Sequence, residues 1–234
     1  MPIGIITDVL SLFVGGLLGG VIGKHINGDM KIALNNTFGF CAMAIGVRLI
    51  VKMNSLSAVV LAMVIGAIVG EIFKLEDHVN RGVKVVAPKI VRNASADEIF
   101  YAQFCAVAVL FCCSGTGWYG CLNEGFTGDI SIMVTKAILD FFTAIIFAAV
   151  LGKLVSYLAV PQAIIYAILF SVSRLVVPLV SKEMIADFSA VGGIVELATG
   201  MRIAGVKRDT KTINLIPAML LVFPISALWT FLFG

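Results

Sequence analysis

The stretch TKAILDFFTAIIFAAVLG, from Thr135 to Gly152, decides the fold of this chain. It is apolar enough for a membrane helix, and a helix of about 20 such residues crosses ~30 Å of hydrocarbon. Within it stand Lys136 and Asp140, which are four residues apart and therefore share one face of a helix. The stretch predicts a membrane-spanning helix that carries a cation and an anion into the bilayer.

The composition of the whole chain agrees with a membrane protein. Of its 234 residues 60% are hydrophobic and only 13% are charged, with a mean hydropathy of +1.06. A soluble domain has about 25% charged residues. The net charge of +3 is spread along short loops, which argues against nucleic-acid binding. The sequence therefore predicts an integral membrane protein with the lipid bilayer as its main partner.

Eight apolar runs indicate an all-α, polytopic helical bundle that forms a single transmembrane domain over residues 1–234. The runs cover residues 5–24, 31–50, 55–73, 98–114, 131–157, 161–181, 184–204 and 212–232. The polar segment 74–98 is predicted to connect two spans on the cytoplasmic side. The glycine-rich segment 115–130 is predicted to be an outer loop or a re-entrant segment.

The positions of the 17 Lys and Arg residues predict the orientation. Cytoplasmic loops of membrane proteins carry an excess of these residues. If the N-terminus is outside, most of them fall in inner loops, and the segment 74–98 holds a large group of them. We therefore expect a multi-pass protein with both termini outside.

Two stretches of the chain resemble each other. Residues 29–48, DMKIALNNTFGFCAMAIGVR, align without gaps on residues 183–202, EMIADFSAVGGIVELATGMR. The alignment pairs Gly39 with Gly193, and both stretches end in Gly-x-Arg. It predicts that spans one to three repeat as spans six to eight. An odd number of helices separates equivalent spans, so the repeat would be inverted, as in many secondary transporters and some channels.

The pair Lys136 and Asp140 is the first candidate for a functional site. An ionisable residue near the bilayer midplane costs about 2.5–3.5 kcal/mol on insertion scales, so it normally faces a partner or water. The pair could tie helices together, or it could open and close with a substrate or proton. Asn35, Asn36 and Glu196 also lie at membrane depth and are further transport or gating candidates.

Five glycines recur three and four residues apart in the first span, which is typical of close helix packing. They are Gly15, Gly16, Gly19, Gly20 and Gly23. The packing surface makes a homodimer plausible. The five cysteines have no C-x-x-C spacing, and no nucleophile–base pair is visible. We expect no metal site, no cofactor and no enzymatic activity.

Several motifs resemble the YqgA/YdfK-like bacterial membrane proteins, the family of domain of unknown function 554. They are GIITDVLSLFVGGLLGGVIGK at residues 4–24, Gly-x-x-Gly-Asp at 125–129, Lys-x-x-Leu-Asp at 136–140 and NLIPAML at 214–220. The resemblance implies a protein of the bacterial cytoplasmic membrane and marks Asp129, Lys136 and Asp140 as motif residues. The family pattern has asparagine where this chain has Asp8.

Together these features favour a transporter of a small solute or ion. Lys136 and Asp140 would form its gate or coupling site, and Asp129 would lie at its outer mouth. Two alternatives remain at this point. One is an ion channel. The other is a non-transporting membrane scaffold or regulator, in which the pair is structural and the segment 74–98 binds a partner.

Overall fold

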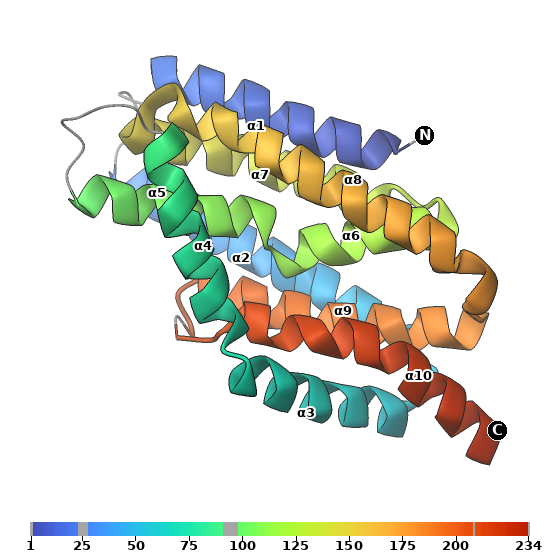
Figure 1. The fold of residues 1–234 in the computed structure, drawn as a ribbon. Helices are drawn as coiled ribbons and strands as arrows, with labels where there is room; N and C mark the ends of the chain where they lie inside the picture. The colour runs from blue at the N-terminus through green and yellow to red at the C-terminus, as the bar shows by residue number, and fades with distance from the viewer. Residues whose placement is uncertain (1, 23–27, 91–97, 208, 234) are drawn as a thin grey trace. The chain divides into compact units, whose positions relative to one another are not determined.

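The computed structural model of the chain describes residues 2–22, 28–90, 98–207 and 209–233, and no strand occurs among them. Figure 1 shows the order of the helices. The α-helices are α1 (Ile3–Ile22), α2 (Gly28–Ile50), α3 (Leu56–Ile72), α4 (Leu75–Ile90), α5 (Glu98–Cys112), α6 (Gly115–Thr127), α7 (Ser131–Leu151), α8 (Ala159–Val176), α9 (Lys182–Ile203) and α10 (Ile216–Phe233). Short 3-10 helices, η2 (Gly152–Leu158), η3 (Val177–Leu179) and η4 (Thr212–Leu215), join some of them.

The predicted fold class is confirmed, because every regular element in the described part of the chain is a helix. Six stretches of it are long and apolar enough to cross a membrane, or seven if the bent pair α3–α4 is one span. One of the six, Ser131–Leu179, is 49 residues long and contains both α7 and α8. The count of eight spans stays a prediction.

The described helices divide between two compact units. The first unit comprises Met1–Leu34 and Asp77–Val172, and the second comprises Asn35–Glu76 and Ser173–Gly234. Each unit is therefore built from segments that are far apart in the sequence.

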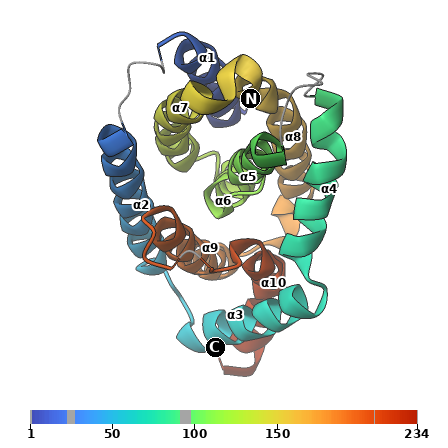
Figure 2. The same ribbon diagram turned by 90° about the vertical axis from the view of Figure 1, so that its left-hand side faces the viewer.

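In the first unit α1 lies beside α7 (Figure 2). Successive glycines of α1 contact successive residues of α7, so the two helices run parallel and the glycines set the distance between them. A Cβ on Gly15 would lie 2.5 Å from the carbonyl oxygen of Phe141, and one on Gly19 would lie 2.8 Å from Ala148 Cβ. Such separations leave no room for a larger residue. Gly16 and Gly20 lie equally close to η2, where Ser156 and Lys153 are their neighbours, and Gly23 is outside the described residues.

The helix α7 ends at Leu151, before the predicted end at residue 157, because Gly152 adopts a backbone conformation with φ 67°. The 3-10 helix η2 follows and returns the chain to α8. Around this turn lies the apolar core of the first unit, in which Leu12, Phe104 and Phe111 are fully buried. The core fixes α1, α5 and α7 against η2.

Residues 115–127 form a helix, α6, rather than a loop. Ser114 caps it by accepting a hydrogen bond from Gly117 N, and Gly128, with φ 76°, ends it. Its glycines allow close packing, since a Cβ on Gly120 would lie 2.5 Å from Met133 Sδ. The combined stretch Gln103–Thr127 is mostly buried.

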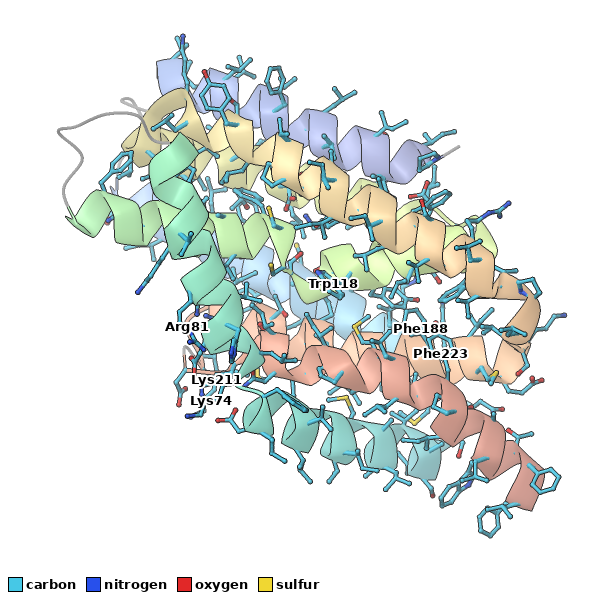
Figure 3. All side chains as sticks on the ribbon, viewed as in Figure 1. Lys74, Arg81, Trp118, Phe188, Lys211 and Phe223 are labelled. Carbon is cyan, nitrogen blue, oxygen red and sulfur yellow. The ribbon has the colours of Figure 1, made fainter. Side chains whose placement is uncertain are left out.

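In the second unit α2 packs antiparallel against α9 through glycines. A Cβ on Gly39 would lie 2.7 Å from Gly200 O, and one on Gly46 would lie 2.6 Å from Gly193 O. The helices α3 and α10 also lie side by side (Figure 2). Phe188 on α9 stacks on Phe223 of α10 with 5.2 Å between ring centroids (Figure 3).

The predicted connecting segment 74–98 contains α4, whose polar and apolar residues lie on opposite faces. The helix continues through Pro88 to Ile90, and residues 91–97 lie outside the described part. Lys74, between α3 and α4, has φ 47°.

Candidate functional site

A group of charged and polar side chains lies buried in the first unit. At its centre is Lys136 on α7, which is 2% exposed. Its Nζ is 3.3 Å from Asp8 Oδ2 on α1 and forms an ion pair with Asp140 Oδ2 one turn along α7. Asp8 is fully buried and Asp140 is 8% exposed. One ammonium group therefore holds two carboxylates from two helices.

Gln162 on α8 completes the group. Its Nε2 donates to Asp8 Oδ2 and Asp140 Oδ2, at 3.1 Å each, and lies 3.4 Å from the carbonyl oxygen of Phe111. The hydroxyl of Tyr166, one turn further along α8, donates to the same carbonyl at 2.9 Å. We call these five side chains, Asp8, Lys136, Asp140, Gln162 and Tyr166, together with the Phe111 carbonyl, the Lys136 cluster.

The Phe111 carbonyl is available because the α5–α6 stretch is broken (Figure 1). α5 ends at Cys112 and α6 begins at Gly115. A helix that stops leaves its last carbonyl groups without intrahelical partners. Inside a membrane protein such groups must be satisfied by neighbouring side chains or water. Here Tyr166 and Gln162 do so, and a Cβ on Gly117 would collide with the Tyr166 hydroxyl.

A second buried acid holds α1 in place beside the cluster. Glu124 on α6, 3% exposed, accepts hydrogen bonds from Gly4 N at 2.9 Å and Ile5 N at 3.1 Å. A carboxylate at the N-terminus of a helix satisfies unpaired N–H groups and interacts favourably with the helix dipole. Glu124 thus fixes the start of α1, one turn before Asp8.

The charges of the Lys136 cluster do not balance, since two carboxyl groups face one ammonium group. Two buried oxygens, Asp8 Oδ1 and Gln162 Oε1, also have no hydrogen-bond partner in the described structure. Buried polar atoms are nearly always paired, so exceptions mark unusual sites. The cluster can accept at least one further positive charge or donor.

The predicted site residues do not all meet. Lys136 and Asp140 do, but Asp129 is exposed on the turn before α7, where its Oδ1 accepts a hydrogen bond from Ser131 N at 2.9 Å. Asn36 and Glu196 belong to the second unit, and Glu196 is buried there. The side chain of Asn35 lies outside the described residues.

Sequence reasoning did not select Asp8 and Gln162. Asp8 is the acid in an otherwise apolar first span, and a buried ionisable residue there was a sufficient signal. Gln162 lies 154 residues after Asp8. The same offset aligns residue 29 with residue 183 in the two similar stretches. Applied to Asp8, that offset leads directly to Gln162.

In the second unit a buried acid holds the start of a helix. Asp187 on α9 is fully buried and accepts hydrogen bonds from Asn54 N, Ser55 N and Ser226 Oγ, at 2.9, 2.7 and 2.7 Å. It therefore holds the N-terminus of α3, as Glu124 holds that of α1. All three partners of Asp187 are hydrogen-bond donors. In the Lys136 cluster, by contrast, two carboxyl groups share the same two donors.

Comparison with known proteins identifies the family to which the chain is similar. The model of the family described as "Protein of unknown function (DUF554)" matches residues 3–227. The chain is 43% identical to the uncharacterized protein YqgA of Escherichia coli (strain K12), over 98% of both chains. It is 26% identical to the uncharacterized membrane protein YdfK of Bacillus subtilis (strain 168), over 93% of each. No solved structure matches. With a match over nearly its whole length, this membrane protein belongs to the DUF554 family.

Proposed function

We propose that this protein is a transporter of a small solute or ion in the bacterial cytoplasmic membrane. The observation that carries the proposal is the Lys136 cluster, in which Lys136, Asp8 and Asp140 are buried in a helical membrane protein. Ionisable residues in membrane helices are costly and typically mark ion or substrate pathways.

The arrangement of the cluster favours a working site over a structural lock. A buried ion pair that only joins helices stabilises a protein best when its remaining hydrogen-bonding atoms are satisfied. Here Asp8 Oδ1 and Gln162 Oε1 have no partner, and the charges are uneven. These features suit a site that binds and releases something.

The glycine contacts of the second unit support the proposed inverted repeat. The alignment pairs Gly39 with Gly193 and Gly46 with Gly200. Gly39 contacts Gly200, and the residues equivalent to these two, Gly193 and Gly46, also contact each other. A two-fold axis between α2 and α9 would produce this pattern. In secondary transporters, inverted repeats of this kind allow one half to move against a fixed site.

In the proposed mechanism Lys136 is the exchangeable partner. A cationic substrate or coupling ion near the carboxylates would compete with the ammonium group for Asp8 and Asp140. Because these two acids come from α1 and α7, losing one ion pair would loosen the contact between the two helices. Asp129, on the exposed turn before α7, would lie at the outer mouth.

We further propose eight spans with both termini outside. The stretch Ser131–Leu179 is about twice the length that one crossing requires, and Gly152 turns the chain near its middle. Counting α7 and α8 as separate spans, and α3 as a span that the segment 74–98 follows on the cytoplasmic side, gives eight. An even number puts both ends on the same side.

The test compares purified wild type with Asp140→Asn in liposomes, screening the flux of protons, sodium, chloride and small anions. Asp209→Asn is the matched control, because Asp209 is an exposed acid paired with Lys207 outside the helices. We expect Asp140→Asn to abolish flux while the protein stays folded, and Asp209→Asn to leave it unchanged.

Thermal unfolding is measured on all three proteins. If no solute moves in wild type and Asp140→Asn mainly lowers the unfolding temperature, the pair is structural and the scaffold alternative replaces the transporter. If flux persists without saturation at high solute concentration, the protein is a channel.

A further inference from the structure

We infer that Asp8 is a proton-binding group, which carries one exchangeable proton directed toward Gln162. The role of this proton as the coupling ion rests on the transporter function proposed above. The existence of the proton site rests only on the geometry of the Lys136 cluster.

The charges of the Lys136 cluster favour one bound proton. Asp8 Oδ2 and Asp140 Oδ2 share the same two donors, Lys136 Nζ and Gln162 Nε2. With both acids ionised, the buried cluster would carry one net negative charge. Two carboxylates that share a site do not readily ionise together. A single proton makes the cluster neutral.

The unpaired atoms show where that proton belongs. Asp8 Oδ1 and Gln162 Oε1 are both buried acceptors without a donor. A proton on Asp8 Oδ1 converts this oxygen into a donor, for which Gln162 Oε1 is the unused acceptor. Since Gln162 Nε2 already donates to Asp8 Oδ2, the carboxyl and the amide would then form a two-bond ring.

The amide orientation that this requires is fixed by its other neighbours. The Phe111 carbonyl oxygen can only accept, and it lies 3.4 Å from Gln162 Nε2. Asp140 Oδ2 is an acceptor as well and lies 3.1 Å away. Turning the amide would place Oε1 against these acceptors, so its nitrogen must face them. Gln162 Oε1 therefore stays free for a donor from Asp8.

A metal cation fits the two free oxygens less well than a proton does. Hard cations such as Mg²⁺ and Ca²⁺ take six or more oxygen ligands. Asp8 Oδ2, Asp140 Oδ2 and the Phe111 carbonyl oxygen already accept hydrogen bonds from Lys136, Gln162 or Tyr166. The two unpaired oxygens, Asp8 Oδ1 and Gln162 Oε1, are the number that one proton requires to form a hydrogen bond.

Release of the proton can be written as one step. The O–H bond at Asp8 Oδ1 breaks, its electron pair stays on the carboxylate, and the proton passes to a water molecule. The cluster then changes from neutral to one net negative charge, so Lys136 is attracted more strongly toward Asp8. The ionisable side chains that interact with Asp8 come from three helices: Lys136 and Asp140 from α7, Tyr166 from α8 and Cys121 from α6.

The experiment is infrared difference spectroscopy of the purified full-length protein in lipid, recorded across a pH series in H₂O and D₂O. A protonated carboxyl group has a C=O absorption that shifts when its proton exchanges for deuterium. We expect one such band in wild type, its loss in Asp8→Asn, and its shift in Gln162→Leu, which removes the acceptor. Glu124→Gln is the matched control, because backbone N–H groups surround that buried carboxylate, and it should leave the band in place.

The site is overturned if wild type has no deuterium-sensitive carboxyl band, or if the band survives in folded Asp8→Asn. Gln162→Leu retains Asp8, so it tests the site even if Asp8→Asn fails to fold: an unshifted band then overturns the assignment. The flux assay is read separately. A band at Asp8 without any flux supports the proton site and removes the transporter, whereas flux that is unchanged in Asp8→Asn supports a transporter and overturns the coupling role.

Discussion

Lys136 Nζ lies 3.3 Å from Asp8 Oδ2, although 128 residues separate the two positions. The contact joins α7 to α1 inside the first unit and is fully enclosed. Lys136 also faces the ring of Tyr166, whose centroid is 5.6 Å from Nζ, so the ammonium group has an aromatic neighbour in addition to its carboxylates. The stability of the unit should therefore depend on this single side chain.

Lys136→Met should lower the free energy of unfolding by roughly 3 kcal/mol or more, because removing one partner leaves buried carboxyl groups uncompensated. Adding Asp140→Asn should restore part of the loss, since it removes the remaining charge. Unfolding in mild detergent measures both effects. Lys207→Met, which breaks the exposed pair with Asp209, is the control and should cost at most about 1 kcal/mol. Equal losses in Lys136→Met and Lys207→Met would contradict the importance of the cluster.

The glycines of α1 give a second prediction. A Cβ on Gly19 would lie 2.5 Å from Ile145 Cα and 2.8 Å from Ala148 Cβ. Gly19→Ala should therefore push α1 away from α7 and cost about 1–3 kcal/mol, as overpacking usually does. Gly82→Ala on α4 is the control, because nothing lies within 4 Å of a Cβ there, and it should be neutral or stabilising by up to about 1 kcal/mol. The unfolding temperatures of the two variants measure the difference. An unchanged unfolding temperature in Gly19→Ala would contradict the close packing of α1 on α7.

The apolar runs predicted the helices to within a few residues, because the thickness of the hydrocarbon layer limits where a span can begin and end. The end of α7 was missed, since one glycine with positive φ stops the helix inside an apolar run. The glycines of residues 115–130 predict an outer loop or a re-entrant segment, and the re-entrant position stays a prediction. Residues 115–127 of this segment are helical. They form α6 because neighbouring side chains fill the space that glycine leaves.

Two of the five side chains of the Lys136 cluster could be predicted from the sequence. Lys136 and Asp140 share a helix, so their contact follows from spacing alone. Asp8 and Gln162 lie on other helices, and only the packing of α1 and α8 on α7 brings them together. Sequence periodicity carries no information about which helices are neighbours. The repeat offset was the one sequence signal that linked Asp8 to Gln162.

Asp187 provides a third prediction, in the second unit. Asp187→Asn should cost about 1–3 kcal/mol, because its carboxylate accepts three hydrogen bonds and the amide would turn a donor toward one of those donors. Ser226→Ala removes only one of the three bonds and should cost roughly 1 kcal/mol or less. Chemical or thermal unfolding compares them. A larger loss in Ser226→Ala than in Asp187→Asn would show that the cap on α3 is not the important contact.

The antiparallel glycine contact gives a fourth prediction. Gly46→Ala and Gly200→Ala should each cost about 1–3 kcal/mol, because a Cβ would meet a backbone oxygen of the opposite helix at 2.6 or 2.7 Å. The double variant should lose less than the sum, since the first methyl group already separates α2 from α9. Gly28→Ala, on the same helix α2 with nothing within 4 Å, is the control. Strict additivity would mean that the two contacts are independent of each other.

The proposed orientation gives the last prediction, which single cysteines can test. Lys52, between α2 and α3, and Lys207, after α9, are both exposed. With eight spans and the N-terminus outside, residue 52 faces out and residue 207 faces the cytoplasm, in agreement with the excess of basic residues in inner loops.

A membrane-impermeant maleimide added to intact spheroplasts should therefore modify Lys52→Cys and leave Lys207→Cys unmodified, with the wild-type cysteines as the blank. Lysis should make both react, which shows that each site is accessible. Labelling of Lys207→Cys before lysis, with Lys52→Cys protected, would reverse the orientation, and labelling of both would place the two loops on the same side and refute the proposed number of spans.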